Sequence, residues 1–201
     1  MDNKGKFIVF EGLDGAGLST QALRLENYLG ARGRQVLLTK EPTAGLLGGI
    51  LKSTLRGELK LSSRALQLLF SADRAQHVDT EIVPALAEGK IVISDRYFYS
   101  TFAYGIASEV EYDWLLDINR KFLVPDMTIL LDVEPETSLK RMSQGRFTSE
   151  LFEKKESLTK VRNAFLTLAK EFNFRVISGE GSIEQVSDRI AEAVDSLLQS
   201  Q

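Results

Sequence analysis

The sequence predicts a three-layer α/β fold, in which helices cover both faces of a five-stranded parallel sheet. Short apolar runs alternate with longer amphipathic stretches, which is the pattern of parallel strands joined by crossover helices. Most of the short runs are apolar throughout, as expected for strands that are covered on both faces. The five predicted strands are residues 7–10, 36–38, 91–93, 127–131 and 175–177.

The elements follow one another in the order that this fold requires. The first strand leads through a glycine-rich turn into a helix predicted over 19–31, which Gly33 is placed to stop. Helical patterns at 45–55 and 62–88 are too long for a simple crossover, so we expect residues 43–88 to form a packed insert over the carboxyl edge of the sheet. A last helix is predicted over 182–198, with Ser182 as its cap.

Length and composition indicate one folded domain, residues 1–201, and exclude several function classes. Apolar residues make up 43% of the chain and charged residues 26%, as in soluble globular proteins. The net charge of −3 provides no general positive field for nucleic acid or an anionic membrane. Without Cys and with one His, the chain has no disulfide, thiol nucleophile or multi-His metal cluster. With no spanning stretch or signal-like core either, we expect a cytoplasmic protein.

A phosphate-binding loop is predicted between the first strand and the first helix. Gly12, Gly17 and Ser19 match the template in which four residues separate two glycines and a Lys and a Ser or Thr follow. Its amide N–H groups and the helix N-terminus suit phosphate oxygens, and the Ser19 hydroxyl suits Mg²⁺. A tight turn without a ligand is the alternative. The candidate nucleotide-binding residues are Gly12, Asp14, Gly15, Ala16, Gly17, Leu18, Ser19 and Thr20.

One charged member of the template is missing, because Leu18 occupies the position of its lysine. An aliphatic side chain provides no ammonium for the transferred phosphoryl group, so turnover is expected to fall on the order of 10²–10³-fold, with less effect on binding. A naturally weakened relative, a substitution and a compensating cation elsewhere all remain open.

Four segments carry a resemblance to a known family. They are GLDGAG at 12–17, KEP at 40–42, LLFSADR at 68–74 and DRY at 95–97. In this order and spacing, over nearly the whole chain, they resemble thymidylate kinases, which are P-loop NTPase-type enzymes that pass the γ-phosphate of ATP to dTMP. The resemblance implies ATP as co-substrate, Mg²⁺, dTMP as acceptor and a homodimer.

The resemblance also assigns an acceptor site. Phe70 and Arg74 share a helix face, and the family implies that they stack on the base and hydrogen-bond its carbonyl; a core phenylalanine and a solvated cation are the alternatives. Arg96 suits the acceptor phosphate at the carboxyl end of the third strand. Asp95 suits the magnesium shell, with a helix-capping role as the alternative. Further acceptor contacts are implied for Asp14, Lys40, Pro42, Ser100, Thr101 and Tyr104.

Two of these assignments keep a second interpretation from the residues alone, and a third departs from the family pattern. Asp14 resembles the carboxylate that approaches the acceptor sugar, but it also fits an uncommitted loop residue. Lys40 stands where many relatives have Arg, so attraction to phosphate persists without a bidentate fork. Tyr104 belongs to an aromatic cluster that is equally typical of a core. His77 follows Arg74 by one helical turn and is expected to be partly exposed, with a position facing the base pocket as the alternative.

A lid is predicted over about residues 141–156. Some members of the family carry an Arg inside the phosphate loop and others a compensating Arg in the lid. Gly15 occupies the loop position, so this chain resembles the second type, with Arg141 and Arg146 as candidates and surface cations as the alternative.

The predicted activity is therefore phosphoryl transfer from ATP to dTMP, giving dTDP and ADP in dTTP biosynthesis, slowed by Leu18. The predicted catalytic residues are Asp14, Arg96, Arg141 and Arg146. Two alternatives come from other function classes: a nucleotide-binding sensor with an intact dTMP pocket, and a kinase for another pyrimidine monophosphate or a nucleoside.

Overall fold

A computed structural model describes residues 5–143 and 149–199 and contains the predicted parallel sheet. Its strand order is β2-β3-β1-β4-β5, and all four neighbouring pairs are parallel. Each of the five predicted apolar runs forms one strand. The strands are β1 (Lys6–Gly12), β2 (Val36–Lys40), β3 (Ile91–Asp95), β4 (Met127–Asp132) and β5 (Arg175–Ser178).

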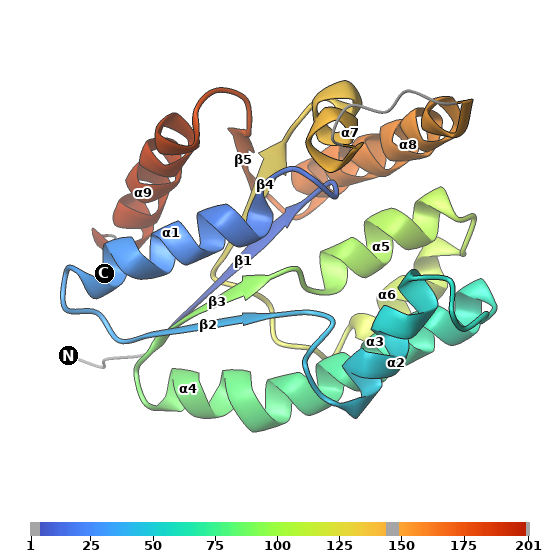
Figure 1. Ribbon diagram of the computed structural model, residues 1–201. Helices are drawn as coiled ribbons and strands as arrows, with labels where there is room; N and C mark the ends of the chain where they lie inside the picture. The colour runs from blue at the N-terminus through green and yellow to red at the C-terminus, as the bar shows by residue number, and fades with distance from the viewer. Residues whose placement is uncertain (1–4, 144–148, 200–201) are drawn as a thin grey trace.

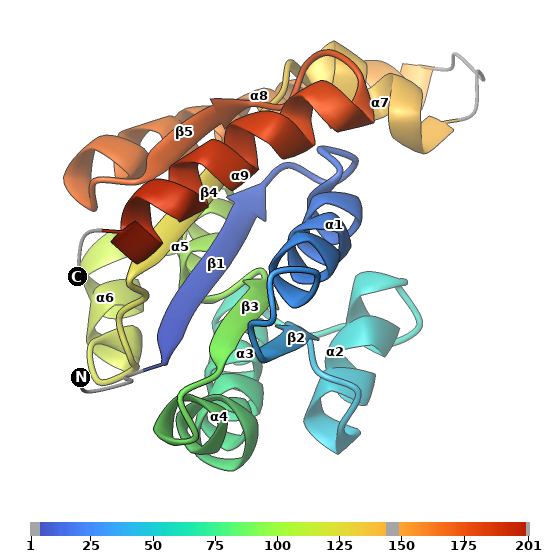
Figure 2. The ribbon, with the colours of Figure 1, turned by 90° about the vertical axis from the view of Figure 1, so that its left-hand side faces the viewer.

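Helices cover both faces of the sheet. Successive side chains of a strand point to opposite faces, so each face carries apolar side chains that a helix can bury. Ile8 and Phe10 of β1 pack in a buried cluster with α1 (Leu18–Gly30) and α9 (Ile183–Gln199). Phe7 and Val9 face the opposite way, into a cluster that includes α5 (Phe98–Ala107) and α8 (Ser149–Glu171). Figures 1 and 2 show this arrangement, with α1 and α9 on one side of the sheet and the remaining long helices on the other.

The stretch between β2 and β3 is helical almost throughout. It contains α2 (Leu46–Leu55), α3 (Ser63–His77), the π-helical turn η1 (Val78–Ile82) and α4 (Val83–Ala87). The Ser62 hydroxyl accepts a hydrogen bond from the amide of Ala65 and caps α3. Figure 1 shows α2 beyond the end of β2, at the carboxyl edge of the sheet, whereas α4 lies near the start of β3.

Two further helices, α6 (Tyr112–Asn119) and α7 (Pro135–Ser143), complete the described chain. Helix α7 follows β4, where the lid is predicted, but Gly145 and Arg146 lie outside the described residues. Helix α1 begins one residue earlier than predicted, at Leu18, because Gly17 with φ 97° is its cap. Among the described helices, none is long and apolar enough to cross a membrane.

Candidate active site

The phosphate loop curls between β1 and α1 at the carboxyl edge of the sheet. Gly15 and Gly17 have φ values of 80° and 97°, which a residue with a Cβ adopts only with strain. The loop forms one wall of a cleft of about 310 Å³. The cleft is lined by Leu13, Asp14, Gly15, Gly17, Leu18, Ser19, Thr20, Glu41, Asp95 and Arg96. The structure thus brings the predicted loop residues together with the ends of two neighbouring strands.

The Leu18 side chain serves the apolar layer beneath the loop. It is 6% exposed and belongs to the buried cluster that contains Ala22 and Leu25 of the same helix. A Cβ built on Gly12 would lie 3.3 Å from Leu18 Cδ2, so the leucine packs close against the start of the loop. Leu18 therefore fits its position sterically but brings no charge to the cleft.

Ser19 and Asp95 form a polar pair on the cleft wall. The Ser19 hydroxyl, in the first turn of α1, donates a hydrogen bond to Asp95 Oδ2 at the end of β3. A hydroxyl and a carboxylate are oxygen ligands of the kind that Mg²⁺ prefers beside phosphates. No group of three or more His, Cys, Asp or Glu side chains suited to a metal occurs among the described residues. A magnesium ion here would thus take its other ligands from phosphates and water.

Arg96 lines the same cleft. Its backbone φ is 73°, and its Nη1 donates to the Gly12 carbonyl oxygen at 3.0 Å and to Ser100 Oγ at 2.9 Å. Its Nη2 lies 2.7 Å from Asp14 Oδ1. The Tyr104 ring is 5.5 Å from the guanidinium. Three predicted acceptor-site residues, Asp14, Ser100 and Tyr104, therefore meet around the Arg96 guanidinium.

Glu11 supports this arrangement from inside the protein. Its carboxylate accepts hydrogen bonds from the amides of Tyr97 and Ser100 and from the Ser100 hydroxyl, and so caps the start of α5. Burial raises the pKa of Glu11 to about 7, although the hydrogen bonds from Ser100 and the charge of Arg96 oppose the shift. Both partners lie more than 80 residues from Glu11 in the sequence, so this role depends on the tertiary fold.

The predicted base-reading residue Arg74 is buried, with 1% of its surface exposed. Its Nε donates to Glu41 Oε2 at 2.9 Å, its Nη1 to Asn119 Oδ1 at 2.7 Å and its Nη2 to Thr101 Oγ1 at 2.9 Å. The alternative of a solvated cation is thus wrong. Phe70, one turn earlier on α3, is half-buried. The family resemblance predicted Thr101 as a site residue, but nothing in the sequence predicted the contact of Asn119 with Arg74.

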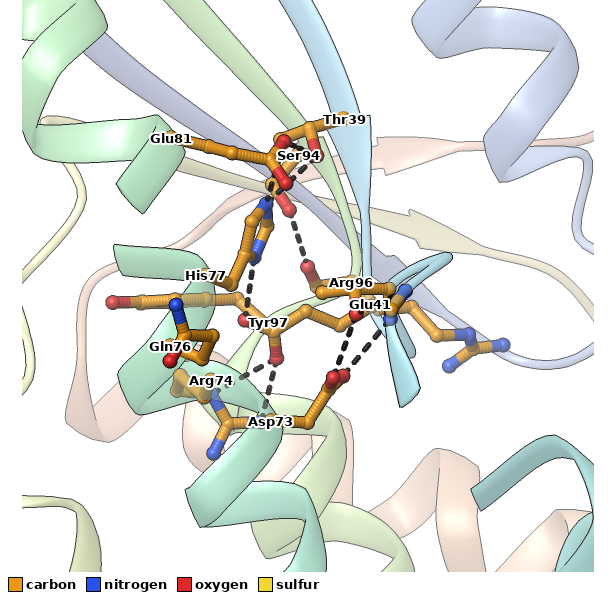
Figure 3. Close-up of polar contacts among 12 residues, drawn as sticks. Thr39, Glu41, Asp73, Arg74, Gln76, His77, Glu81, Ser94, Arg96 and Tyr97 are labelled. Atoms are coloured by element: carbon orange, nitrogen blue, oxygen red, sulfur yellow. Dashed lines mark hydrogen bonds and ion pairs between the residues drawn. The ribbon is translucent and has the colours of Figure 1, made fainter. Parts of the chain in front are cut away.

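The expectation that His77 is partly exposed is wrong. Its side chain is 0% exposed, because Glu41 pairs with Nδ1 and Thr39 with Nε2 (Figure 3). Both partners lie at the end of β2, far from His77 in the sequence. No periodicity of α3 could reveal them.

The turn after β2 is fastened to α3. Asp73 accepts hydrogen bonds from the amide and the hydroxyl of Thr43, at 2.9 Å and 2.7 Å. Pro42 follows a cis peptide bond and is half-buried, and Lys40 is exposed at the end of the strand. Of this turn, Glu41 lines the cleft.

Helix α7 packs directly on the phosphate loop. Ser138 Oγ donates to the Asp14 carbonyl oxygen, and Arg141 donates to the carbonyl oxygens of Ala16 at 3.2 Å and Gly179 at 3.0 Å. A second cavity of about 510 Å³ adjoins the loop here. Its lining includes Gly15, Gly17 and Thr20, which also line the first cleft, and Arg141.

Comparison with known proteins identifies the family. The sequence model of the family described as thymidylate kinase matches residues 10–190, which is most of the chain. The chain belongs to the thymidylate kinase family. The predicted family and fold are thereby confirmed. By its family the chain is a nucleoside monophosphate kinase.

Curated relatives of the thymidylate kinase family align with this chain over nearly their whole lengths. A probable thymidylate kinase of Thermococcus kodakarensis is 41% identical, over 96% of this chain and 98% of the relative. A probable thymidylate kinase of Pyrococcus horikoshii is 42% identical, over 97% and 98%. A thymidylate kinase of Caldicellulosiruptor saccharolyticus is 38% identical, also over 97% and 98%.

Proposed function

We propose that this member of the thymidylate kinase family transfers the γ-phosphoryl group of ATP to the phosphate of dTMP, giving dTDP and ADP. The observation that carries the proposal is that the phosphate loop and Arg96 line one cleft, with Ser19 and Asp95 between them. Donor phosphates on the loop and an acceptor phosphate on Arg96 would face each other across that cleft.

The donor side is supported by two adjoining features. The N–H groups of residues 15–20 and the N-terminus of α1 provide the positive end of a helix for the phosphates. The neighbouring cavity of about 510 Å³ has room for the rest of the nucleotide, and Arg141 stands on its wall. With Mg²⁺ bound, Ser19 and Asp95 would hold it, and the ion would neutralise charge on the bridging phosphate oxygens.

The acceptor side offers donors that match a nucleoside monophosphate. Arg96 has a planar fork for phosphate oxygens, which would replace Asp14 as its partner. Arg74 has five N–H donors, and four of them face Glu41, Asn119 and Thr101, so one donor on Nη1 remains for a base carbonyl. The Tyr104 hydroxyl is buried without a hydrogen-bond partner among the described residues. Phe70 would stack on the base, and Ser100, Thr101, Lys40 and Pro42 would complete the pocket.

The reaction needs no general base, because the attacking acceptor phosphate oxygen is already an anion. It forms a bond to the γ-phosphorus of ATP while the bond from that phosphorus to the β–γ bridging oxygen breaks, and ADP leaves with the electron pair. Positioning and charge stabilisation are the whole catalytic task. Since Leu18 provides no cation, we assign this charge to Arg96, Arg141 and the lid residue Arg146, with Asp14 placing the acceptor and the metal.

An acceptor panel tests the proposal. ADP release is measured with dTMP, dUMP, UMP and thymidine, each with and without Mg²⁺. We expect dTMP to give the highest kcat/KM and Mg²⁺ to be required. A preference for UMP or for uncharged thymidine would refute the assignment of the base and phosphate sites.

Leu18 favours a second candidate, a nucleotide-binding sensor that turns over very slowly. Calorimetry with dTMP and the ADP assay separate the two functions. A sensor predicts dTMP binding with no ADP release above background, and release only in the Leu18→Lys variant. We also propose a homodimer, as the family resemblance implies, which sedimentation velocity measures directly.

A further inference from the structure

We propose that His77 is a positioning residue that orients the Glu41 carboxylate and, through it, the guanidinium of Arg74. The inference rests on the proposed function, in which Arg74 contacts the acceptor base. His77 is the only histidine of the chain, and its ring lies between the ends of β2 and α3 (Figure 3).

Both ring nitrogens of His77 are engaged. Nδ1 lies 3.1 Å from Glu41 Oε1, and Nε2 lies 2.7 Å from Thr39 Oγ1. A carboxylate only accepts hydrogen bonds, so the Nδ1–H of His77 donates to Glu41. The Thr39 hydroxyl holds the opposite edge of the ring at Nε2, so the ring is fixed from both sides.

The Glu41 carboxylate divides its two oxygens between two partners. Oε1 faces His77, whereas Oε2 lies 2.9 Å from Nε and 2.8 Å from Nη2 of Arg74. The side chains of Glu41 and Arg74 are 3% and 1% exposed, so no bulk water is available to replace either contact. Rotation of the carboxylate away from His77 would also move its other oxygen away from Arg74.

Orientation matters here because the guanidinium is planar. Asn119 engages Nη1, and Thr101 shares Nη2 with Glu41, so the three partners fix the plane in which the remaining N–H of Nη1 points. A donor that is displaced by a fraction of an ångström loses much of its hydrogen bond to a base carbonyl. The Glu41–His77 contact therefore acts on recognition of the acceptor and not on the donor phosphates.

Two substitutions that mimic opposite sides of the ring test the proposal. In His77→Asn the amide nitrogen takes the place of Nδ1 and can still donate to Glu41. In His77→Gln the amide nitrogen takes the place of Nε2 and reaches Thr39 instead. We expect His77→Gln to raise the Kd and the KM for dTMP about tenfold or more, with kcat and the KM for ATP within about twofold of the unchanged protein. His77→Asn should stay within about threefold for every constant.

Asp79→Asn is the matched control, because Asp79 is exposed two residues after His77, and it should change nothing. Thermal melting and calorimetry are measured on all variants. Equal dTMP binding by the Asn and Gln variants, whether strong or weak, would overturn the inference. Absence of dTMP binding by the unchanged protein would refute the proposed function. Binding by the unchanged protein together with equal binding by the Asn and Gln variants would refute only the role of His77.

Discussion

Arg141 Nη1 donates a hydrogen bond to the carbonyl oxygen of Ala16, 3.2 Å away across 125 residues of sequence. Its Nη2 donates to the carbonyl oxygen of Gly179 at 3.0 Å. One side chain of α7 therefore contacts both the phosphate loop and the turn after β5. The loop that lacks the usual lysine at position 18 therefore still has a cation against its backbone.

Removal of this cation is expected to slow transfer strongly. Arg141→Met should lower kcat by about 10²-fold or more, because the charge developing on the phosphoryl oxygens loses a donor and the loop has no lysine to compensate. Steady-state ADP release measures the effect. Lys140→Met, at the exposed neighbouring position, is the control and should stay near the unchanged rate. An Arg141→Met enzyme within threefold of the unchanged kcat would contradict the assignment.

Restoration of the lysine is expected to act in the opposite direction. Leu18→Lys should raise kcat on the order of 10²-fold, because an ammonium then reaches the transferred phosphoryl group. The same change removes a 6% exposed leucine from the apolar cluster, so we expect about 1–3 kcal/mol less stability towards urea.

Leu18→Met is the matched comparison, since it keeps an apolar side chain of similar volume. It should leave both kcat and the urea midpoint close to those of the unchanged protein. Equal rates for the Lys and Met variants would mean that another cation already does the work of the missing ammonium.

The close contact between Gly15 and α7 leaves no room for a side chain at position 15 of the loop. Gly15 has φ 80°, and a Cβ there would lie 2.7 Å from the Ser138 carbonyl oxygen. Gly15→Ala should therefore cost about 1–3 kcal/mol of stability, seen as a melting temperature lower by several degrees. Gly15→Arg should be destabilised at least as much and should gain no activity, although other family members carry Arg at this loop position. Gly49→Ala, with open space around its Cβ, should melt no lower than the unchanged protein.

Glu11 is expected to make stability depend on pH. Burial raises its folded-state pKa from 4.5 to about 7, so between those values the folded state binds more protons than the unfolded state. The free energy of unfolding therefore falls as pH rises from about 4.5 to 7, by an amount on the order of 1–3 kcal/mol. Glu11→Gln, whose amide oxygen can still accept from the amides of Tyr97 and Ser100, should lose this slope in urea unfolding. The exposed Glu192→Gln should keep it.

Local patterns predicted much of the fold and part of the site. Apolar runs indicated all five strands, and β1, β3 and β4 are buried as such runs predict. The edge strand β2 is half-buried and β5 is mostly exposed. The glycines predicted the phosphate loop from the sequence, because glycine is the residue that adopts a positive φ without strain. Phe70 and Arg74 were placed on one face by helix geometry alone.

The sequence by itself determined the sheet, the phosphate loop and the family, because each depends on residues near one another in the chain or on their order. Only the tertiary structure decided the burial of His77, the hold of Glu11 on α5 and the contact of Arg141 with Ala16. In each case the partners lie more than thirty residues apart and meet only after the strands have paired. Burial then removes water as a competing partner, so a side chain that could face solvent becomes a fixed part of the site.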